Sequence, residues 1–200
     1  MTAGSDGADG GLVCPSPRAT DVIQLAHGGG GRLMHELLRT VFLPAFGDPL
    51  ETGGHDSAVF TADSAQLAFT TDGYVVQPLE FPGGDIGSLA VHGTVNDLLM
   101  AGARPRHLSV SFILEAGLPL ATLRRIVASM RDAAAASGVG IVTGDTKVVE
   151  AGHGDGIYLA TSGVGALLPG AAIGPGAIRP GDRLILSGVL GRHGLAVMAS

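Results

Sequence analysis

The chain has 200 residues, of which 46% are hydrophobic and 15% charged, and its formal net charge is -6. A chain of this length and composition can bury roughly 70% of the surface that its unfolded form exposes, so we expect a full hydrophobic core and exclude a disordered protein. The negative charge argues against a nucleic acid or an anionic membrane as the main partner, whereas it is compatible with a small anionic ligand.

The N-terminal segment 1–20 is rich in glycine, serine, aspartate and proline and lacks the apolar stretch of a signal peptide, so we expect a disordered tail. It contains Cys14, the one cysteine of the sequence, which allows no internal disulfide and fits a reducing compartment. No apolar run of the sequence is long enough to cross a membrane. These features predict a cytoplasmic protein without a membrane partner.

A strand, a glycine loop and a helix are expected next. Apolar residues alternate over 21–25, which predicts a short strand, and apolar residues recur at helical spacing over 32–42. Between these two elements lie four consecutive glycines: Gly28, Gly29, Gly30 and Gly31.

The remainder of the chain mixes strands with helices. Residues 57–73 read as two strands joined by a turn near Asp63 and Ser64. An almost wholly apolar helix is expected over 85–101, closed by Gly102. The same periodicities predict a strand over 106–115, a helix over 120–137, and strands over 140–149 and 156–167. This order predicts an α/β (α+β) domain with a mixed or antiparallel sheet flanked by helices.

A segment dense in proline and glycine, 169–180, is expected to be a linker that follows a first domain over 21–168. The sequence RLILSG then predicts a new strand, and we interpret residues 181–200 as the beginning of a second α/β domain. Because Ser200 falls inside a predicted helix, we expect the chain to be part of a longer protein.

Four aspartates lie at joints between apolar segments or in the buried helix, and each is a candidate ligand for a cation: Asp56, Asp72, Asp97 and Asp145. An aspartate beside glycine can equally be a turn or capping residue, so this alternative stays open for all of them except Asp97. Asp97 falls in the last turns of an apolar helix, where the helix dipole and desolvation both disfavour a carboxylate, so something cationic should compensate it. If the carboxylates converge, two of them about 4 Å apart repel by about 4 kcal/mol at an effective dielectric constant of 20. Oxygen ligands without a histidine or cysteine cluster favour Mg²⁺, which normally arrives with substrate phosphates.

The glycine loop would complement such a site. Backbone amides of glycines can approach phosphate oxygens closely, and this loop leads into a helix N-terminus. The sequence is neither a P-loop nor a dinucleotide-binding fingerprint, and a flexible linker is the alternative interpretation. Lys147, two residues after Asp145, is a further candidate phosphate contact, although a lone lysine on a strand is usually only solvated.

Five motifs, in this order, resemble the HypE family of hydrogenase maturation factors: HGGGGRLMHELL, HDSAVF, TTDGYVVQPLEFPGGDIGSLAVHGTVNDLLMAGARPRHLSVSFILE, GVGIVTGDTKVVE and LSGVLGRHGLAVMAS. The resemblance covers residues 21–200. This family is related to aminoimidazole ribonucleotide synthetase, selenophosphate synthetase and thiamine monophosphate kinase. The resemblance implies a PurM-like N-terminal domain that binds ATP and pairs its strands with those of a second subunit, followed by a C-terminal α/β domain.

The resemblance also implies an activity. HypE-like proteins use ATP to dehydrate a carboxamide, carried on their own C-terminal cysteine, to a thiocyanate that supplies the cyanide ligand of nickel–iron hydrogenase. An amide oxygen is a poor leaving group, and transfer of the γ-phosphoryl group to it makes phosphate the leaving group, so Mg²⁺ ligands and phosphate donors are what the protein must provide. The expected partners are a second copy in a homodimer, the carbamoyltransferase HypF, and the HypC–HypD complex as cyanide acceptor.

The resemblance assigns site residues by position. Asp56, Asp72, Asp97 and Asp145 are expected to hold Mg²⁺. The expected nucleotide contacts are Gly28, Gly29, Gly30, Gly31, Arg32, Thr71, Asn96, Gly144 and Thr146. Lys147 would neutralise the transferred phosphoryl group or the developing oxyanion. His193 lies in a glycine-rich turn before a helix and is expected in a phosphate or substrate loop of the second domain.

The other histidines carry weaker assignments. His92 lies four residues before Asn96 and could face the site with it or be structural. A surface or packing role is expected for His35 and His107, and a hairpin turn rather than a metal site for His153.

One departure from the family pattern concerns the acceptor cysteine, because the sequence ends at Ser200 without one and Cys14 does not match that motif. Three alternatives therefore stay open. The first is a selenophosphate synthetase, which would need a cysteine or selenocysteine beside its glycine loop. This chain has His27 and Arg32 there, which argues against this alternative. A thiamine phosphate kinase and a non-catalytic module that binds a nucleotide or a partner are the other two.

Overall fold

The computed structural model describes residues 23, 25–28, 30–46, 55 and 57–199. The chain divides into two units, Met1–Asp48 and Pro49–Ser200, and each is described by itself. The tail expected over 1–20 lies outside the described residues, as do Gly29 and Asp56 of the expected site.

The described part of the first unit is helical. A 3-10 helix, η1 (Leu25–Gly28), is followed by α1 (Arg32–Leu37), which continues through a π-helical segment, η2 (Leu38–Phe42), into α2 (Leu43–Phe46). The helix predicted over 32–42 is thus confirmed. The strand predicted over 21–25 is wrong at Leu25, which begins η1, while three of its residues lie outside the described part. A short apolar run cannot form a strand alone, because its backbone groups need a neighbouring strand to bond.

A five-stranded sheet forms the centre of the second unit. Its strands are β1 (Ala58–Ala62), β2 (Ala65–Tyr74), β5 (Ala103–Glu115), β6 (Gly140–Val149) and β7 (Ile157–Leu167). They lie in the order β1-β2-β7-β5-β6, and all neighbours are antiparallel except β5 and β6. The expected mixed sheet is confirmed, and every strand predicted between residues 57 and 167 is present.

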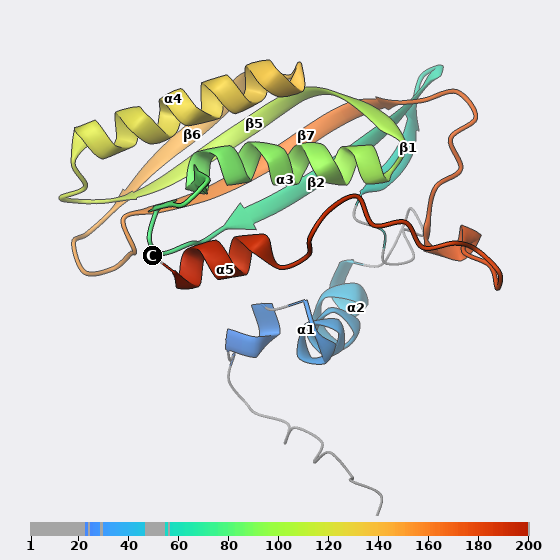
Figure 1. Cartoon of the computed structure of the whole chain (residues 1–200), viewed down its shortest axis with the longest axis horizontal. Helices are drawn as coiled ribbons and strands as arrows, with labels where there is room; N and C mark the ends of the chain where they lie inside the picture. Colours follow the sequence, from blue (N-terminus) through green and yellow to red (C-terminus); the bar gives the residue numbers. More distant parts are fainter. Residues whose placement is uncertain (1–22, 24, 29, 47–54, 56, 200) are drawn as a thin grey trace, which may run out of the picture. The chain divides into compact units, whose positions relative to one another are not determined.

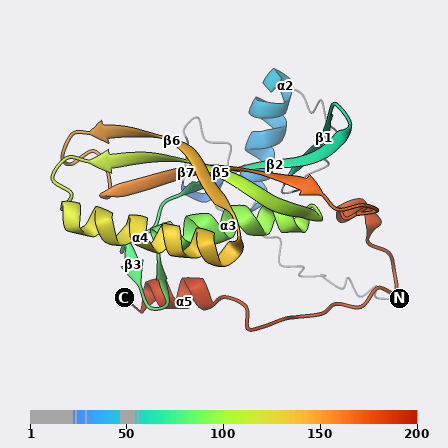
Figure 2. The same ribbon diagram turned by 90° about the horizontal axis from the view of Figure 1, so that it is seen from above.

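Two long helices, α3 (Ile86–Met100) and α4 (Leu120–Ser137), cover the same face of this sheet (Figures 1 and 2). A Cβ atom at Gly87 on α3 would lie 2.7 Å from the carbonyl oxygen of Ile126 on α4, so the two helices pack with their backbones close together. The opposite face of the sheet is covered by no described helix of this unit (Figure 2). In the described part of this unit, one face of the sheet therefore packs against helices and the other carries no helical layer.

Local signals fix the ends of these elements. The Asp85 carboxylate accepts a hydrogen bond from the Ser88 N–H at 2.9 Å, and the Ser88 hydroxyl accepts one from the Asp85 N–H at 3.0 Å, a capping box that starts α3. Gly102, with a φ of 72°, follows the end of α3, and Gly138, with a φ of 67°, ends α4. The helices predicted over 85–101 and 120–137 are accordingly confirmed.

The hydrophobic core lies between the sheet and the two helices. Its largest fully buried side chains come from both layers: Ile86, Val91, Leu98, Leu108, Val110, Ile126, Met130, Ile157 and Leu159. Burial of this many apolar side chains, at about 1.5–3 kcal/mol each, is the main stabilising contribution to the fold.

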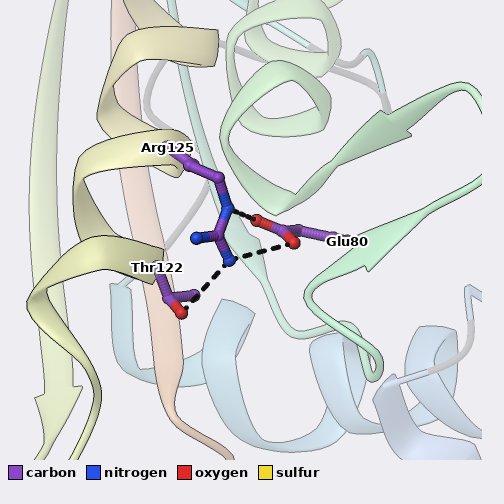
Figure 3. A network of polar contacts seen from close by, with 3 residues as sticks. All are labelled: Glu80, Thr122 and Arg125. Carbon is purple, nitrogen blue, oxygen red and sulfur yellow. Dashed lines mark hydrogen bonds and ion pairs between the residues drawn. The ribbon is translucent and has the colours of Figure 1, made fainter.

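A short hairpin, β3 (Glu80–Phe81) and β4 (Gly84–Asp85), leads into α3 and is tied to α4 by an ion pair (Figure 3). The Arg125 guanidinium donates to both carboxylate oxygens of Glu80, at 2.7 and 3.2 Å, and to the Thr122 hydroxyl at 3.3 Å. This hydrogen bonding lowers the pKa of Glu80 below its ordinary value. The bidentate geometry fixes the orientation of the hairpin on α4.

The segment after β7 contains a 3-10 turn, η3 (Pro175–Ala177), and one short helix, α5 (Arg192–Met198). The strand predicted from the sequence RLILSG is wrong, because residues 183–188 form no strand and Leu184, Ile185 and Leu186 are exposed. No described strand lies beside this segment to bond its backbone. Among the described helices, none has the length and apolar character that spanning a membrane requires.

Candidate functional site

The candidate site is built on β2 where α3 covers it. Successive side chains of a strand point to opposite faces, so Thr70, Asp72 and Tyr74 all share the face that α3 covers. Helix α3 contributes Thr94 and Asp97, which lie three residues apart and hence near one another along the helix.

Hydrogen bonds join the two elements around Asp97. The Thr70 hydroxyl donates to Asp97 Oδ2 at 3.1 Å. The Ser57 hydroxyl donates to the Asp97 carbonyl oxygen at 2.9 Å, which connects the segment before β1 to the last turn of α3. The prediction that a cation compensates Asp97 stays a prediction.

A second set of hydrogen bonds surrounds Asp72. The Tyr74 hydroxyl donates to Asp72 Oδ2 at 2.9 Å and lies 3.3 Å from the Thr94 hydroxyl oxygen. Thr94 is fully buried and also bonds the Thr161 hydroxyl of β7. Burial raises the pKa of Tyr74 above its ordinary value. The hydrogen bond with Thr94 acts against burial, and the hydrogen bond and charge of Asp72 and the charge of Asp97 raise the pKa further. Tyr74 therefore remains a hydrogen-bond donor, and the carboxylates of Asp72 and Asp97 each accept a hydrogen bond from a hydroxyl on the same face of β2.

Asp145 lies elsewhere in the same unit. It is in register with Ser111 of β5, which is in register with Ala160 of β7 and so with Gly73 of β2, and these residues face the uncovered side of the sheet. Strands β7 and β5 separate β6 from β2, so Asp145 is three strand spacings, roughly 14 Å, from the strand that carries Asp72. Asp72 and Asp97 thus meet hydroxyls on the covered face of β2, whereas Asp145 lies on the other face. In the described part of the chain, no group of three His, Cys, Asp or Glu side chains could hold a metal ion.

Lys147 is next to Asp145 on the uncovered face. Its ammonium lies 3.0 Å from Asp145 Oδ2, and the two side chains are 70% and 59% exposed. The Lys147 ammonium holds the pKa of Asp145 below its ordinary value, helped by the backbone N–H of Thr146. The two residues form a solvent-exposed pair on an edge strand.

The structure gives Gly144 a local role. A Cβ atom there would collide with the Val110 carbonyl oxygen of β5, so the close pairing of β5 and β6 requires a glycine. Gly144, Asp145 and Thr146 also line a shallow hollow of about 360 Å³ together with Val110 and Phe112. Their expected nucleotide contacts stay a prediction.

Thr71 and Asn96 do not face the Asp72 carboxylate. Thr71 points to the uncovered face, where its hydroxyl donates to the Thr161 carbonyl oxygen at 2.9 Å and accepts from the Ser162 hydroxyl at 3.1 Å. Asn96 is exposed on α3 with His92, on the side turned away from the buried helix face. The expected nucleotide contacts of Thr71 and Asn96 stay predictions.

The remaining expected site residues lie in the first unit or near the end of the chain. Gly28 ends η1, Gly30 has a φ of 71° and Gly31 is the N-cap of α1, which Arg32 begins. His193 is the second residue of α5. Its ring contacts the Phe81 ring edge-on, with the two ring centroids 5.3 Å apart, and both residues line a hollow of about 630 Å³. His153 lies in the turn between β6 and β7, but the hairpin expected there is wrong, because β5 lies between these two strands in the sheet. The functions of the glycine loop and of His193 stay predictions.

Sequence reasoning missed the hydroxyl groups around the two aspartates. Thr70 and Tyr74 bond their carboxylates, Ser57 bonds the Asp97 carbonyl oxygen, and Thr94 and Thr161 lie behind Tyr74. One signal could have found part of this set, because Thr70, Asp72 and Tyr74 alternate along a single strand. Thr94 and Thr161 carried no signal of their own, since threonines in apolar segments are common.

A family model described as the N-terminal domain of AIR synthase related proteins matches residues 54–167, more than half of the chain. The carbamoyl dehydratase HypE of Rhodobacter capsulatus is 54% identical over 183 residues, which are 89% of this chain and 53% of that protein. The HypE of Escherichia coli is 46% identical over 181 residues, covering 88% of this chain and 54% of its own length. The chain therefore spans about half the length of the curated relatives it matches.

Solved structures of HypE proteins are also similar to this chain. A chain of a HypE–HypF complex is 47% identical, with a TM-score of 0.76 over 84% of this chain and 53% of that one. HypE in complex with ATP is 51% identical, with a TM-score of 0.52 over 74% of this chain and 44% of that one. A ThiL protein complexed with AMPPCP and TMP is 18% identical at a TM-score of 0.54 over 74% of this chain and 45% of that one, which shows a shared fold alone.

Proposed function

This chain belongs to the family of AIR synthase related proteins, and from that premise we propose that it is the nucleotide-binding part of a carbamoyl dehydratase of the HypE type. The observation that carries the proposal is the combination of 46–54% identity to HypE proteins with two carboxylates, Asp72 and Asp97, that each accept a hydrogen bond from a hydroxyl on the covered face of β2. The whole protein would use ATP to convert a carboxamide on its C-terminal cysteine to a thiocyanate, the precursor of the cyanide ligand of nickel–iron hydrogenase. The hydrogenase role rests on the relatives.

The donor set of the site fits a hard cation. The carboxylates of Asp72 and Asp97 and the hydroxyl of Thr70 supply oxygen atoms, the ligands that Mg²⁺ prefers. When bound, Mg²⁺ and ATP would supply the phosphoryl group and neutralise its negative charge. Asp56 is proposed as a further ligand from the family pattern, and its neighbour Ser57 contacts the backbone of Asp97. The ATP assignment is supported by the related HypE structure that contains ATP.

The glycine loop 28–31 and Arg32 would bind the phosphates. Glycines at the start of a helix expose backbone N–H groups, and the Gly31 N-cap makes no side-chain cap that would compete with an anion. In the same proposal Thr71, Asn96, Gly144 and Thr146 contact the nucleotide, and Lys147 places a positive charge near the transferred phosphoryl group. His193 is proposed for a substrate loop of the second domain.

A homodimer would give a role to the expected site residues that lie on the uncovered face of the sheet. The face of the sheet that α3 and α4 leave uncovered carries Thr71, Asp145 and Lys147. A second copy packed on this face would cover it, so that Asp145 and Lys147 would act at the dimer interface rather than beside Asp72 of their own chain. This arrangement would account for the position of Asp145, which lies on the face of the sheet opposite to Asp72 in the described part of one chain.

Other partners follow from the relatives. A HypE protein with 47% identity was solved in complex with HypF, and we propose HypF as the protein that delivers the carbamoyl group. The HypC–HypD complex is proposed as the acceptor of the cyanide group. We propose a cytoplasmic location, consistent with the single cysteine of the sequence.

Isothermal titration calorimetry with ATP, in the presence of Mg²⁺ and then of a chelator, tests the nucleotide site. We expect binding that requires Mg²⁺ and that weakens at least tenfold in Asp72→Asn and in Asp97→Asn, because each variant removes a charged ligand while keeping the side-chain shape. Asp132→Asn is the matched control, since Asp132 is exposed on α4 and pairs only with its neighbour Arg131 among the described ion pairs. Equal affinity in all four proteins, or no binding at all, would contradict the proposal.

The reaction itself is tested on a protein of the full length of its relatives. After carbamoylation of the terminal cysteine, addition of ATP should remove one molecule of water from that residue, as measured by mass spectrometry. Phosphorylation of thiamine phosphate by the same protein would instead assign it to the thiamine phosphate kinases.

A further inference from the structure

The Tyr74 hydroxyl joins the strand and the helix that carry the two paired carboxylates. It lies 2.9 Å from Asp72 Oδ2 on its own strand and 3.3 Å from the Thr94 oxygen on α3. Thr94 is fully buried, and its oxygen can accept from the Thr161 hydroxyl. Its single proton goes either to the Tyr74 oxygen or to the Ala90 carbonyl oxygen, which lies 3.0 Å away, and the link to Tyr74 requires the first of these. The tyrosine oxygen is therefore anchored on one side and offers its proton on the other.

The direction of this hydrogen bond is set by the chemistry of the groups. An ionised carboxylate can only accept, and a tyrosine hydroxyl has a single proton, so that proton goes to Asp72. The charge-assisted bond occupies Oδ2 and leaves Oδ1 as the carboxylate oxygen that can be presented to a ligand. A carboxylate held in this way cannot rotate freely about its side-chain bond.

A second hydrogen bond joins β2 to the carboxylate on α3. Thr70, four residues before Tyr74 on the same face of β2, donates to Oδ2 of Asp97 on α3. The strand and the helix are thus linked at two points, Thr70 to Asp97 and Tyr74 to Thr94, with Asp72 between them. These links set the separation of the two carboxylates.

We propose that Tyr74 is a positioning residue that holds the Asp72 carboxylate in the orientation needed to bind a divalent cation together with Asp97. The inference rests on the proposed function, because it presupposes that the cation and the nucleotide bind beside Asp72. Tyr74 would touch neither the nucleotide nor the reacting atoms and would act through Asp72 alone.

Titration of Mg²⁺ by calorimetry, at a fixed saturating concentration of a non-hydrolysable ATP analogue, tests this role. In Tyr74→Phe we expect the dissociation constant for Mg²⁺ to rise by roughly three- to tenfold, the effect of losing one hydrogen bond. Tyr158→Phe is the matched control, because Tyr158 also donates to an aspartate, Asp155 at 2.8 Å, but does so near a surface turn. The control should bind Mg²⁺ like the unmodified chain.

Two variants of Thr94 test the anchoring side and remain informative if Tyr74→Phe fails to fold. Thr94→Val keeps the shape and removes the hydroxyl, so it should weaken Mg²⁺ binding, whereas Thr94→Ser keeps the hydroxyl and should restore it. The inference would be overturned if Tyr74→Phe and Thr94→Val bound Mg²⁺ with the same affinity as the unmodified chain and differed from it only by lower melting temperatures. Tyr74 would then have a structural role alone. If the unmodified chain binds no Mg²⁺ in the presence of the nucleotide analogue, that result contradicts the proposed function itself, and with it the inference.

Discussion

Gly93 of α3 lies so close to the Tyr74 hydroxyl that a Cβ atom at residue 93 would overlap the tyrosine oxygen. The glycine costs helix stability, since glycine is about 1 kcal/mol less favourable than alanine inside a helix. Its presence here is explained by the room it leaves for Tyr74 to reach both Asp72 and Thr94.

The first prediction concerns this contact. Gly93→Ala should lower the free energy of unfolding by about 1–3 kcal/mol, because overpacking outweighs the better helix propensity of alanine. Chemical denaturation measures the change. Gly194→Ala in α5 is the control, because a Cβ atom at Gly194 has no neighbour within 4 Å, and it should not destabilise the chain. A Gly93→Ala variant as stable as the unmodified chain would show that Tyr74 is not confined as described.

A second prediction separates two glycines of the sheet. Gly144→Ala should destabilise the chain by about 1–3 kcal/mol, because its methyl group meets the Val110 carbonyl oxygen of the neighbouring strand. Gly73→Ala should be close to neutral, because a Cβ atom at Gly73 has no neighbour within 4 Å. Both are measured by chemical denaturation without nucleotide. Equal effects would mean that β5 and β6 do not pair this closely.

The third prediction addresses the uncovered face of the sheet. Ala160→Arg places a long charged side chain in the middle of that face and should convert a dimer to a monomer in analytical ultracentrifugation. Ala136→Arg, on the exposed side of α4, is the matched control and should leave the dimer intact. A dimer that survives Ala160→Arg would move the interface to another surface.

The fourth prediction follows from the pKa of Glu80, which Arg125 lowers below its ordinary value of 4.5 (Figure 3). A carboxylate whose pKa is lower in the folded state stabilises that state above the unfolded pKa, and the contribution is lost as the pH falls through the folded pKa. Glu80→Gln should therefore melt at a lower temperature than the unmodified chain at pH 7. The difference should shrink as the pH falls below 4.5 and disappear in stronger acid; a difference that is constant with pH would exclude the ion pair as its cause.

The elements that depend on local signals could be predicted from the sequence. The helix over 120–137 was recognisable because apolar residues recur at helical spacing and Gly138 follows, and the structure gives the same bounds. The turn at Asp63, whose φ is 54°, was marked by its residue types. The strand expected at 183–188 was wrong, and the one expected at 21–25 was wrong at Leu25, because strand formation depends on a partner that the local sequence does not specify.

The site was harder to predict for the same reason. Recognising Asp72, Asp97 and Asp145 as chemically special needed only their positions between apolar segments. Deciding which of them meet required the strand order, which places β7 and β5 between Asp72 and Asp145, and the register, which turns the two side chains to opposite faces. The bond from Tyr74 to Asp72 and Thr94 likewise depends on how α3 packs on β2, a long-range relationship.

The most direct test of the central claim is a crystal structure of the chain with Mn²⁺, which substitutes for Mg²⁺, and a non-hydrolysable ATP analogue. Anomalous scattering locates the Mn²⁺ ions. We predict an ion bound by the carboxylate oxygens of Asp72 and Asp97, with the phosphates of the nucleotide completing its ligands. An ion and a nucleotide bound away from both carboxylates would contradict the account.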